Sequence, residues 1–413
     1  MRILSGQAAR RRVDQLARRG SELASLEPQV RRIVEDVRRA GDRALRRYAE
    51  NWDGLARTAD LRVSQGELEA AWAMAPPRLR GALRQAAANI RRFCQWQRPL
   101  AWERKLEGMT LGQLARPLAS VGCYVPGGRH PLVSTLLMTV VPAQTARVPD
   151  IRVVSPNPPL EVMAAAHLLG VQEFYRVGGA QAIAALAYGT KSIPRVNKIV
   201  GPGNQYVTLA KKLVSFDCAI DFLAGPTEAV IVSHGGRADF VAADLLAQAE
   251  HDPAALPIFI TRSKLLARAV RERVEQLVGG NPAAKQSVAR AGAVLLAGSR
   301  TEAMEWANRI APEHITVDEQ DVGSIQNAGS IFVGDYSAQA AGDYASGPNH
   351  VLPTAGGARF RGGLSVMDFV KIITVQKLSR QGLRRIGKTV VHLAETEGLA
   401  AHAESIRVRC PDA

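Results

Sequence analysis

Apolar residues follow two alternating patterns through the middle of the chain. Short aliphatic runs, which predict strands, alternate with Ala- and Leu-rich stretches at helical spacing. The predicted strands are 151–154, 174–177, 199–200, 229–232, 257–260 and 293–296, and the predicted helices include 162–169, 180–188 and 207–214. Strands that alternate with helices indicate parallel sheets covered by helices. The pattern therefore predicts an α/β fold with two doubly wound units.

The two ends of the chain have different patterns. Residues 1–100 are predicted to be helical, with breaks at Gly20, Pro28 and Pro76–Pro77. From Leu364 onward few strand signals remain. We therefore expect this last segment to form a helical tail with a terminal extended piece.

Composition limits the class of protein. A chain of 413 residues favours two or three compact units. With 46% hydrophobic but only 5% aromatic residues, the cores must be aliphatic. No apolar run reaches the roughly 18 residues of a membrane span, and the N-terminus does not resemble a signal peptide. The four cysteines are far apart without a CxxC pair, which argues against disulfides and thiolate zinc sites and favours a reducing cytoplasm.

The formal net charge of +15 is concentrated near the N-terminus, where residues 1–50 contain thirteen arginines. Acidic residues interrupt these arginines, and Val30, Ile33, Val34 and Val37 recur beside them at helical spacing. This pattern is typical of an amphipathic helix with a charged outer face. Neither aromatic platforms nor a recognition motif accompany the charge, so we expect no nucleic-acid partner. The surplus would attract an anionic cofactor.

Three glycine-bearing turns stand out in the sequence, at 125–128, 177–181 and 200–204. Glycine in such turns lets backbone N–H groups approach a phosphate at a helix N-terminus. The GxGxxG fingerprint is incomplete, because Gly201 and Gly203 fit its first two places but Tyr206 occupies the third. An ordinary turn explains this spacing equally well. The glycine pattern by itself does not identify NAD as a ligand.

Two polar clusters lie at the ends of predicted helices. Gln248 and His251 are three residues apart and could offer two ligands to one metal, although a histidine is also favoured at a helix C-terminus. Glu313 and His314 are adjacent and could supply two proton-transfer groups, although a surface pair is an equally simple interpretation. Both would face one site only if the backbone turned between them.

Two further clusters lie toward the C-terminus. The segment 342–350 is rich in turn formers and contains Asp343 and His350, and Glu397 precedes His402 by five residues in a polar tail. Together Gln248, His251, Asp343 and His402 would form a zinc site without cysteine.

At these residues the chain resembles the histidinol dehydrogenase family, over nearly its whole length from about residue 30. The stretches that carry the resemblance are 121–128, 178–182, 201–204, 221–228, 248–251, 311–314, 342–354 and 394–402.

The resemblance implies two incomplete Rossmann-like domains, a helical N-terminal arm and an extended C-terminal tail. We expect the arm at 1–20, the first domain at 21–123 and 229–364, and the second, NAD-binding domain at 124–228. Residues 365–413 would be a tail exchanged between the two subunits of a homodimer, so that each active site is shared.

The resemblance also implies site residues and an activity. The family oxidises L-histidinol to L-histidine with two NAD, through an aldehyde that stays bound. His314 would be the general base, Glu313 would activate water, and zinc would position the substrate. The ligands of this zinc would be Gln248, His251, Asp343 and His402, which with His314 also border the substrate. Further substrate contacts would be Thr227, His350 and Glu397, and the contacts to NAD would be Tyr124, Gln181 and Asn204.

Two alternative functions remain open from the sequence. A related zinc- and NAD-dependent dehydrogenase could oxidise another polyol, such as a sulfopropanediol, but the retained Glu397 and His402 favour histidinol. A non-catalytic nucleic-acid-binding protein would use the positive charge, but the intact set of polar residues argues against it.

Overall fold

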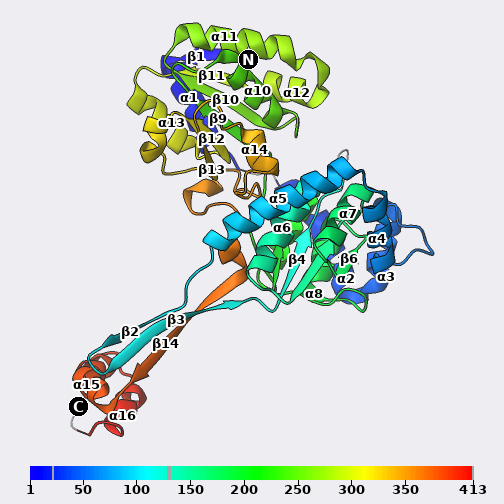
Figure 1. Cartoon of the computed structure of the whole chain (residues 1–413). Coiled ribbons are helices and arrows are strands. Elements are labelled where there is room, and N and C mark those ends of the chain that lie inside the picture. Colours follow the sequence, from blue (N-terminus) through cyan, green and yellow to red (C-terminus); the bar gives the residue numbers. More distant parts are fainter. Residues whose placement is uncertain (21–22, 128–131, 412–413) are drawn as a thin grey trace.

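The computed structural model describes residues 1–20, 23–127 and 132–411. It has two lobes, each built around a parallel sheet, and an arm that projects away from them (Figure 1). The predicted α/β class is confirmed.

One lobe contains a six-stranded parallel sheet in the order β1-β11-β10-β9-β12-β13. Its strands are β1 (Arg2–Ser5), β9 (Glu228–Val232), β10 (Leu256–Thr261), β11 (Ala293–Leu296), β12 (His314–Val317) and β13 (Ser330–Val333). Its helices are α1 (Gly6–Ala17), α10 (Ala238–Ala249), α11 (Lys264–Leu277), α12 (Pro282–Arg290), α13 (Arg300–Ile310) and α14 (Gln339–Tyr344). Helices α1 and α13 cover one face of the sheet, and α10, α11 and α12 cover the other.

The other lobe contains a five-stranded parallel sheet in the order β6-β5-β4-β7-β8. Its strands are β4 (Ser120–Tyr124), β5 (Asp150–Val154), β6 (Glu173–Tyr175), β7 (Lys198–Val200) and β8 (Ala219–Ile220). Its helices are α2 (Glu27–Ala40), α3 (Asp42–Trp52), α4 (Gln65–Met74), α5 (Pro77–Trp96), α6 (Val133–Thr145), α7 (Leu160–Leu168), α8 (Gly179–Tyr188) and α9 (Gln205–Val214). Helices α2, α3, α8 and α9 pack on one face, and α5, α6 and α7 on the other.

The two sheets share one topology. Counted along the chain, β4 to β8 and β9 to β13 both lie in the order 3-2-1-4-5, and β1 adds an edge strand to the second set. This order is the first part of the doubly wound dinucleotide-binding arrangement, in which ligands bind beyond the carboxyl ends of the strands.

Residues 21–123 were expected to belong to the domain of residues 229–364. Instead, the N-terminal helices pack on the five-stranded lobe. Helix α2 lies against α8 and α9 of the five-stranded lobe, and α5 lies against α6. The apolar stripe of α2, formed by Val30, Ile33, Val34 and Val37, is buried there as its spacing predicts. Helical spacing identifies the buried face of a helix but not the sheet that receives it, which explains the difference.

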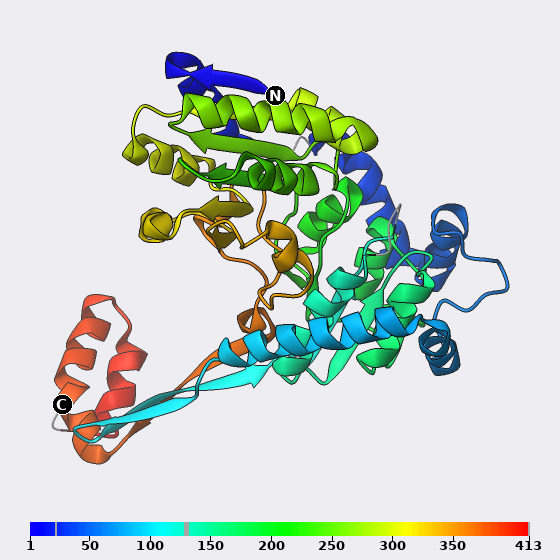
Figure 2. The same ribbon diagram turned by 45° about the horizontal axis from the view of Figure 1, so that its top comes forward.

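The arm consists of an antiparallel sheet, β14-β3-β2, with two helices at its tip. Its elements are β2 (Trp102–Leu106), β3 (Met109–Pro117), β14 (Val370–Leu378), α15 (Arg380–Thr396) and α16 (Ala400–Arg407). Both views show the tip standing away from the two lobes (Figures 1 and 2). The expected order of the tail is therefore wrong, because the extended segment comes first and the helices end it. Most of β14 is exposed, so no burial pattern marks it as a strand.

Among the residues that the structure describes, no helix is long and apolar enough to cross a membrane.

Candidate active site

Glu313 and His314 lie where helix α13 turns into strand β12. The helix ends at Ile310, the next residue, Ala311, has a left-handed conformation with φ of 49°, and His314 begins the strand. After this turn, Glu313 Oε2 and His314 Nδ1 lie 3.7 Å apart, although adjacent side chains on a regular helix would diverge. Both side chains are buried, with exposed fractions of 7% and 3%. The backbone turn thus brings an acid and an imidazole to one point.

Asp343 joins His314 to the end of helix α10. The Nε2 atom of His314 lies 3.3 Å from Asp343 Oδ1, and the Gln248 amide donates to Asp343 Oδ2 at 2.9 Å. The main-chain oxygen of Asp343 lies 2.6 Å from His350 Nδ1. The ring of His314 also stacks on Phe332, with 5.9 Å between centroids. Elements far apart in sequence therefore fix the His314 ring from several sides.

Burial and neighbouring charges raise the pKa of Glu313 and His314 and lower that of Asp343. Burial raises the pKa of Glu313 to about 8, even though the neighbouring His314 lowers it. Burial lowers the pKa of His314, but Glu313 and Asp343 reverse this and leave the pKa raised. For Asp343, burial raises the pKa but the contact with His314 outweighs it, so the pKa is lowered. Groups with such perturbed pKa values are typical of acid–base sites.

The four expected zinc ligands are only partly brought together. Gln248 contacts Asp343, and His251 is close enough to lower the pKa of Asp343. His402 lies on α16 at the tip of the arm, away from both lobes (Figures 1 and 2). Within the described part of one chain, no cluster of three or more His, Cys, Asp or Glu side chains could hold a metal.

This partial set still fits a borderline-hard metal. The amide oxygen of Gln248, the carboxylate of Asp343 on α14 and the imidazole of His251 are donors that zinc accepts. The fourth expected donor, His402, is on α16 in the arm and is not beside them.

The other expected substrate contacts are divided in the same way. Thr227 directly precedes β9 and is half-buried, and the backbone of Glu228 donates to Glu313 Oε2 at 3.0 Å. His350 lies beside Asp343, whereas Glu397 is exposed after α15 in the arm. One chain thus supplies one side of the cluster, without Glu397 or His402.

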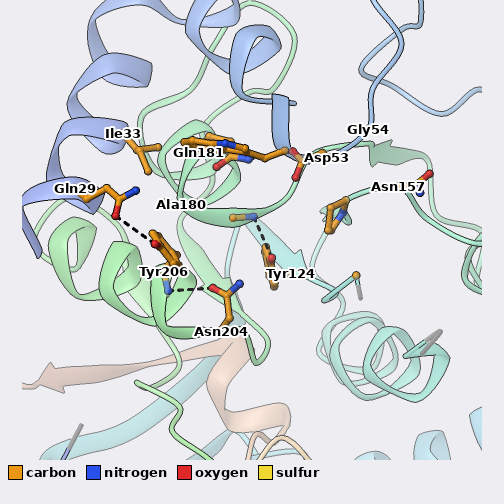
Figure 3. Close-up of a pocket in the computed structure, with 14 residues that line it drawn as sticks. Gln29, Ile33, Asp53, Gly54, Tyr124, Asn157, Ala180, Gln181, Asn204 and Tyr206 are labelled. Atoms are coloured by element: carbon orange, nitrogen blue, oxygen red, sulfur yellow. Dashed lines mark hydrogen bonds between the residues drawn. The ribbon is translucent and has the colours of Figure 1, made fainter. Parts of the chain in front are cut away.

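A separate pocket of about 660 Å³ opens beyond the carboxyl ends of β4, β5 and β7. The three expected NAD contacts, Tyr124, Gln181 and Asn204, all line it (Figure 3). The backbone N–H of Gly179 donates to the Tyr124 hydroxyl at 3.1 Å, and Asn204 caps α9 by accepting from Tyr206 N at 3.0 Å. Glu313 and His314 are not among the residues that line this pocket.

The glycine turns shape the pocket through close backbone approach. Gly201 has φ of +114°, and a Cβ there would lie 2.2 Å from the main-chain oxygen of Tyr124. Gly127 and Gly178 both approach Pro156 closely. Gly128, also part of the first predicted turn, lies outside the described residues. The turn at 200–204 therefore requires glycine at position 201 on steric grounds.

Sequence reasoning missed several residues of these sites. Asp53 and Trp52 line the pocket from the end of α3, and Asp53 accepts from Gln181 Nε2 at 3.0 Å. Glu228 and Arg19 form an ion pair behind Glu313. Glu228 is a carboxylate at the start of an otherwise apolar strand, and this position could have marked it in the sequence. Nothing local marks Arg19 among its neighbouring arginines.

The comparisons with known proteins agree on one family. Residues 16–410 match the family model described as histidinol dehydrogenase. A histidinol dehydrogenase of Methanothermobacter thermautotrophicus is 46% identical over 396 residues, with 92% of each chain covered. One of Aquifex aeolicus is 43% identical over 411 residues, covering 97% of this chain and 96% of the relative. The crystal structure of histidinol dehydrogenase from Elizabethkingia anophelis superposes with a TM-score of 0.94 at 35% identity, covering 99% and 98% of the two chains.

Proposed function

This chain belongs to the histidinol dehydrogenase family, and we propose that it oxidises L-histidinol to L-histidine in two NAD-dependent steps with L-histidinaldehyde held between them. The observation that carries this proposal is the convergence of Glu313 and His314 beside Asp343, where two proton-transfer groups face one point.

In the first step His314 acts as the general base. It takes the proton of the substrate hydroxyl while a hydride leaves the same carbon for NAD⁺, which gives the aldehyde and NADH. The contact with Asp343 orients the ring and stabilises the imidazolium that forms.

In the second step Glu313 supplies the water chemistry. Its carboxylate takes a proton from a water molecule as the oxygen of that water bonds to the aldehyde carbon. The carbonyl oxygen takes up the proton that His314 received in the first step, which gives a neutral hydrate and returns His314 to its basic form. His314 then removes a hydroxyl proton from the hydrate while a second hydride passes to a second NAD⁺. The sum is one alcohol, one water and two NAD⁺ converted to one carboxylate, two NADH and three protons.

Zinc, when bound by Gln248, His251, Asp343 and the partner's His402, would hold the imidazole and amino groups of the substrate. The pocket beside the five-stranded sheet would bind NAD⁺ through Tyr124, Gln181 and Asn204. The chain would then hold the substrate and the NAD⁺ pocket at a constant distance and orientation through both steps.

The test is the stoichiometry of purified, zinc-loaded protein on L-histidinol. We expect about two NADH per L-histidinol consumed, with L-histidine as product. Turnover of a sulfopropanediol without turnover of L-histidinol would assign the chain to the polyol alternative instead.

The shared site is tested with heterodimers that combine a His402→Ala chain with a His251→Ala chain. If the arm acts in the partner's site, one of the two sites regains a complete ligand set and about half of the wild-type activity returns. If His402 acted within its own chain, both sites would stay defective and no activity would return.

A further inference from the structure

The carboxyl group of Glu313 depends for its placement on the backbone at the start of β9. Its Oε2 atom accepts from the N–H of Glu228 at 3.0 Å, across 85 residues of sequence. His314 also lies beside this point, because its strand pairs with β9 at Ala229 and its ring meets the Glu228 main chain, but Asp343 and Phe332 hold the ring from other sides. A small displacement of the chain at Glu228 would therefore move Glu313 more than His314.

The side chain of Glu228 points into a buried ion pair with Arg19. The Arg19 Nε atom donates to Glu228 Oε1 at 2.5 Å and its Nη2 atom donates to Glu228 Oε2, which is a bidentate arrangement. The side chains are only 13% and 3% exposed. The N–H of Ala355 also donates to Glu228 Oε1 at 2.8 Å. A planar guanidinium fixes both the position and the orientation of such a carboxylate, which a lysine cannot do.

Arg19 also holds the turn that leads into Glu313. It donates to the main-chain oxygen of Ile310 at 2.7 Å and to that of Ala311 at 3.2 Å. These are the last residue of α13 and the left-handed residue that follows it. One side chain thus contacts both segments that fix Glu313, namely the start of β9 and the end of α13.

From this geometry we propose that Arg19 is a positioning residue for Glu313, acting through Glu228 and through the turn at Ala311. It touches neither substrate nor cofactor. It serves the water-addition step more than the first oxidation, because the His314 ring has additional contacts with Asp343 and Phe332. The assignment of the affected step rests on the function proposed above.

The test compares Arg19→Met and Arg19→Lys with Arg10→Met in full-length, zinc-loaded protein. Arg10 is a matched control because, like Arg19, it joins the N-terminal segment to α13, but through Glu302 at 2.8 Å near the start of that helix, and it is 67% exposed. For each variant, kcat and KM are measured separately for two reactions. The first is the oxidation of L-histidinol to the aldehyde, and the second is the oxidation of L-histidinaldehyde to L-histidine.

We expect Arg19→Met to lower kcat on the aldehyde by roughly tenfold to a hundredfold, the cost of a displacement of about 1 Å. Its KM for the aldehyde and its rate on the alcohol should change by less than about threefold. Arg19→Lys keeps the positive charge but loses the bidentate contact to Glu228, so its rate on the aldehyde should stay reduced. Arg10→Met should match wild type. Equal losses in both steps, or equal losses in Arg19→Met and Arg10→Met, would overturn the proposal.

A substrate-free measurement separates this proposal from the proposed function. Hydrogen exchange of the Glu228 amide should accelerate in Arg19→Met and in Glu313→Gln but not in Arg10→Met, because its hydrogen bond to Glu313 is lost or weakened. Unchanged exchange in Arg19→Met contradicts the positioning role, even if wild-type protein oxidises L-histidinol. Faster exchange in a protein that does not oxidise L-histidinol would retain the positioning role and reject the function.

Discussion

The six-stranded and five-stranded sheets share a strand order but carry their polar groups at opposite ends. In the five-stranded sheet, the pocket lies beyond the carboxyl ends of the strands, where doubly wound sheets usually bind ligands. In the six-stranded sheet, Glu228 and His314 mark the amino ends of β9 and β12. A common topology therefore does not determine which end of a sheet becomes a site.

The difference has a physical basis in how each end is built. Glycine turns with close backbone approach border the pocket, and its lining combines aromatic side chains (Trp52, Tyr124 and Tyr206) with neutral amides such as Gln181 and Asn204. Buried carboxylates and imidazoles form the other cluster, and each of them needs a compensating partner. We infer that one sheet end serves binding and the other serves proton transfer.

Replacing His314 would break the proton-transfer side most completely. We expect His314→Asn to lower both oxidations by roughly 10²- to 10⁴-fold, because the general base is lost from both steps. Single-turnover measurements on the alcohol and on the aldehyde would show this directly. A variant that kept either step at the wild-type rate would assign the base elsewhere.

The five-stranded lobe contains a buried ion pair, and its removal should lower the free energy of unfolding. Lys211 and Asp221 pair with exposed fractions of 2% and 0%, and both hold the turn at Gly201 through its main-chain O and N atoms. We expect Lys211→Met to reduce the free energy of unfolding by about 3–5 kcal/mol, because it leaves a buried carboxylate unpaired.

Urea denaturation of Lys211→Met and of the adjacent Lys212→Met measures this effect. Lys212 is 53% exposed and pairs with Glu27 at 3.3 Å, so its replacement should change stability by less than about 1 kcal/mol. Equal effects of the two substitutions would show that the buried pair does not stabilise the turn.

Glu313→Gln should separate the two oxidation steps. The amide cannot take a proton from water, so we expect kcat on L-histidinaldehyde to fall by roughly a hundredfold while oxidation of the alcohol changes little. The reverse result, a lost first step with normal aldehyde turnover, would exchange the roles of Glu313 and His314.

The pH dependence should give the smallest effect. Burial raises the pKa of Glu313 to about 8, so most of this carboxyl is protonated at neutral pH and cannot act as a base. The aldehyde step should therefore accelerate by roughly tenfold between pH 7 and pH 9 and level off above the pKa. Glu313→Gln should lose the part of this rise that is due to Glu313. An identical pH profile in the variant would argue that another group controls the step.

The sequence predicted the two sheets better than it predicted the arm. Strands such as β9 and β10 are buried along nearly their whole length, so they appear as continuous apolar runs. Strand β14 is exposed along most of its length and has no such signature, so it was missed. Helical spacing correctly identified the buried stripe of α2 but could not identify the sheet against which it packs.

The candidate site was predictable only where its residues are close in sequence. Glu313 and His314 are neighbours, and Gln248 and His251 share a helix end, so each pair formed a visible cluster. Arg19 and Glu228 are 209 residues apart and meet only in the folded chain. Long-range ion pairs of this kind leave no pattern in a single sequence.

The assignment of NAD⁺ to one sheet end and of the substrate to the other is tested most directly by calorimetry. NAD⁺ and L-histidinol are titrated into two variants in zinc-containing buffer. Gln181→Ala removes a side chain of the pocket, and Gln248→Ala removes one beside Asp343. Our account predicts that Gln181→Ala weakens binding of NAD⁺ by roughly tenfold or more and leaves binding of L-histidinol unchanged, and that Gln248→Ala does the reverse. If either variant weakened both ligands equally, or if the two effects were exchanged, the assignment of NAD⁺ and substrate to opposite sheet ends would be contradicted.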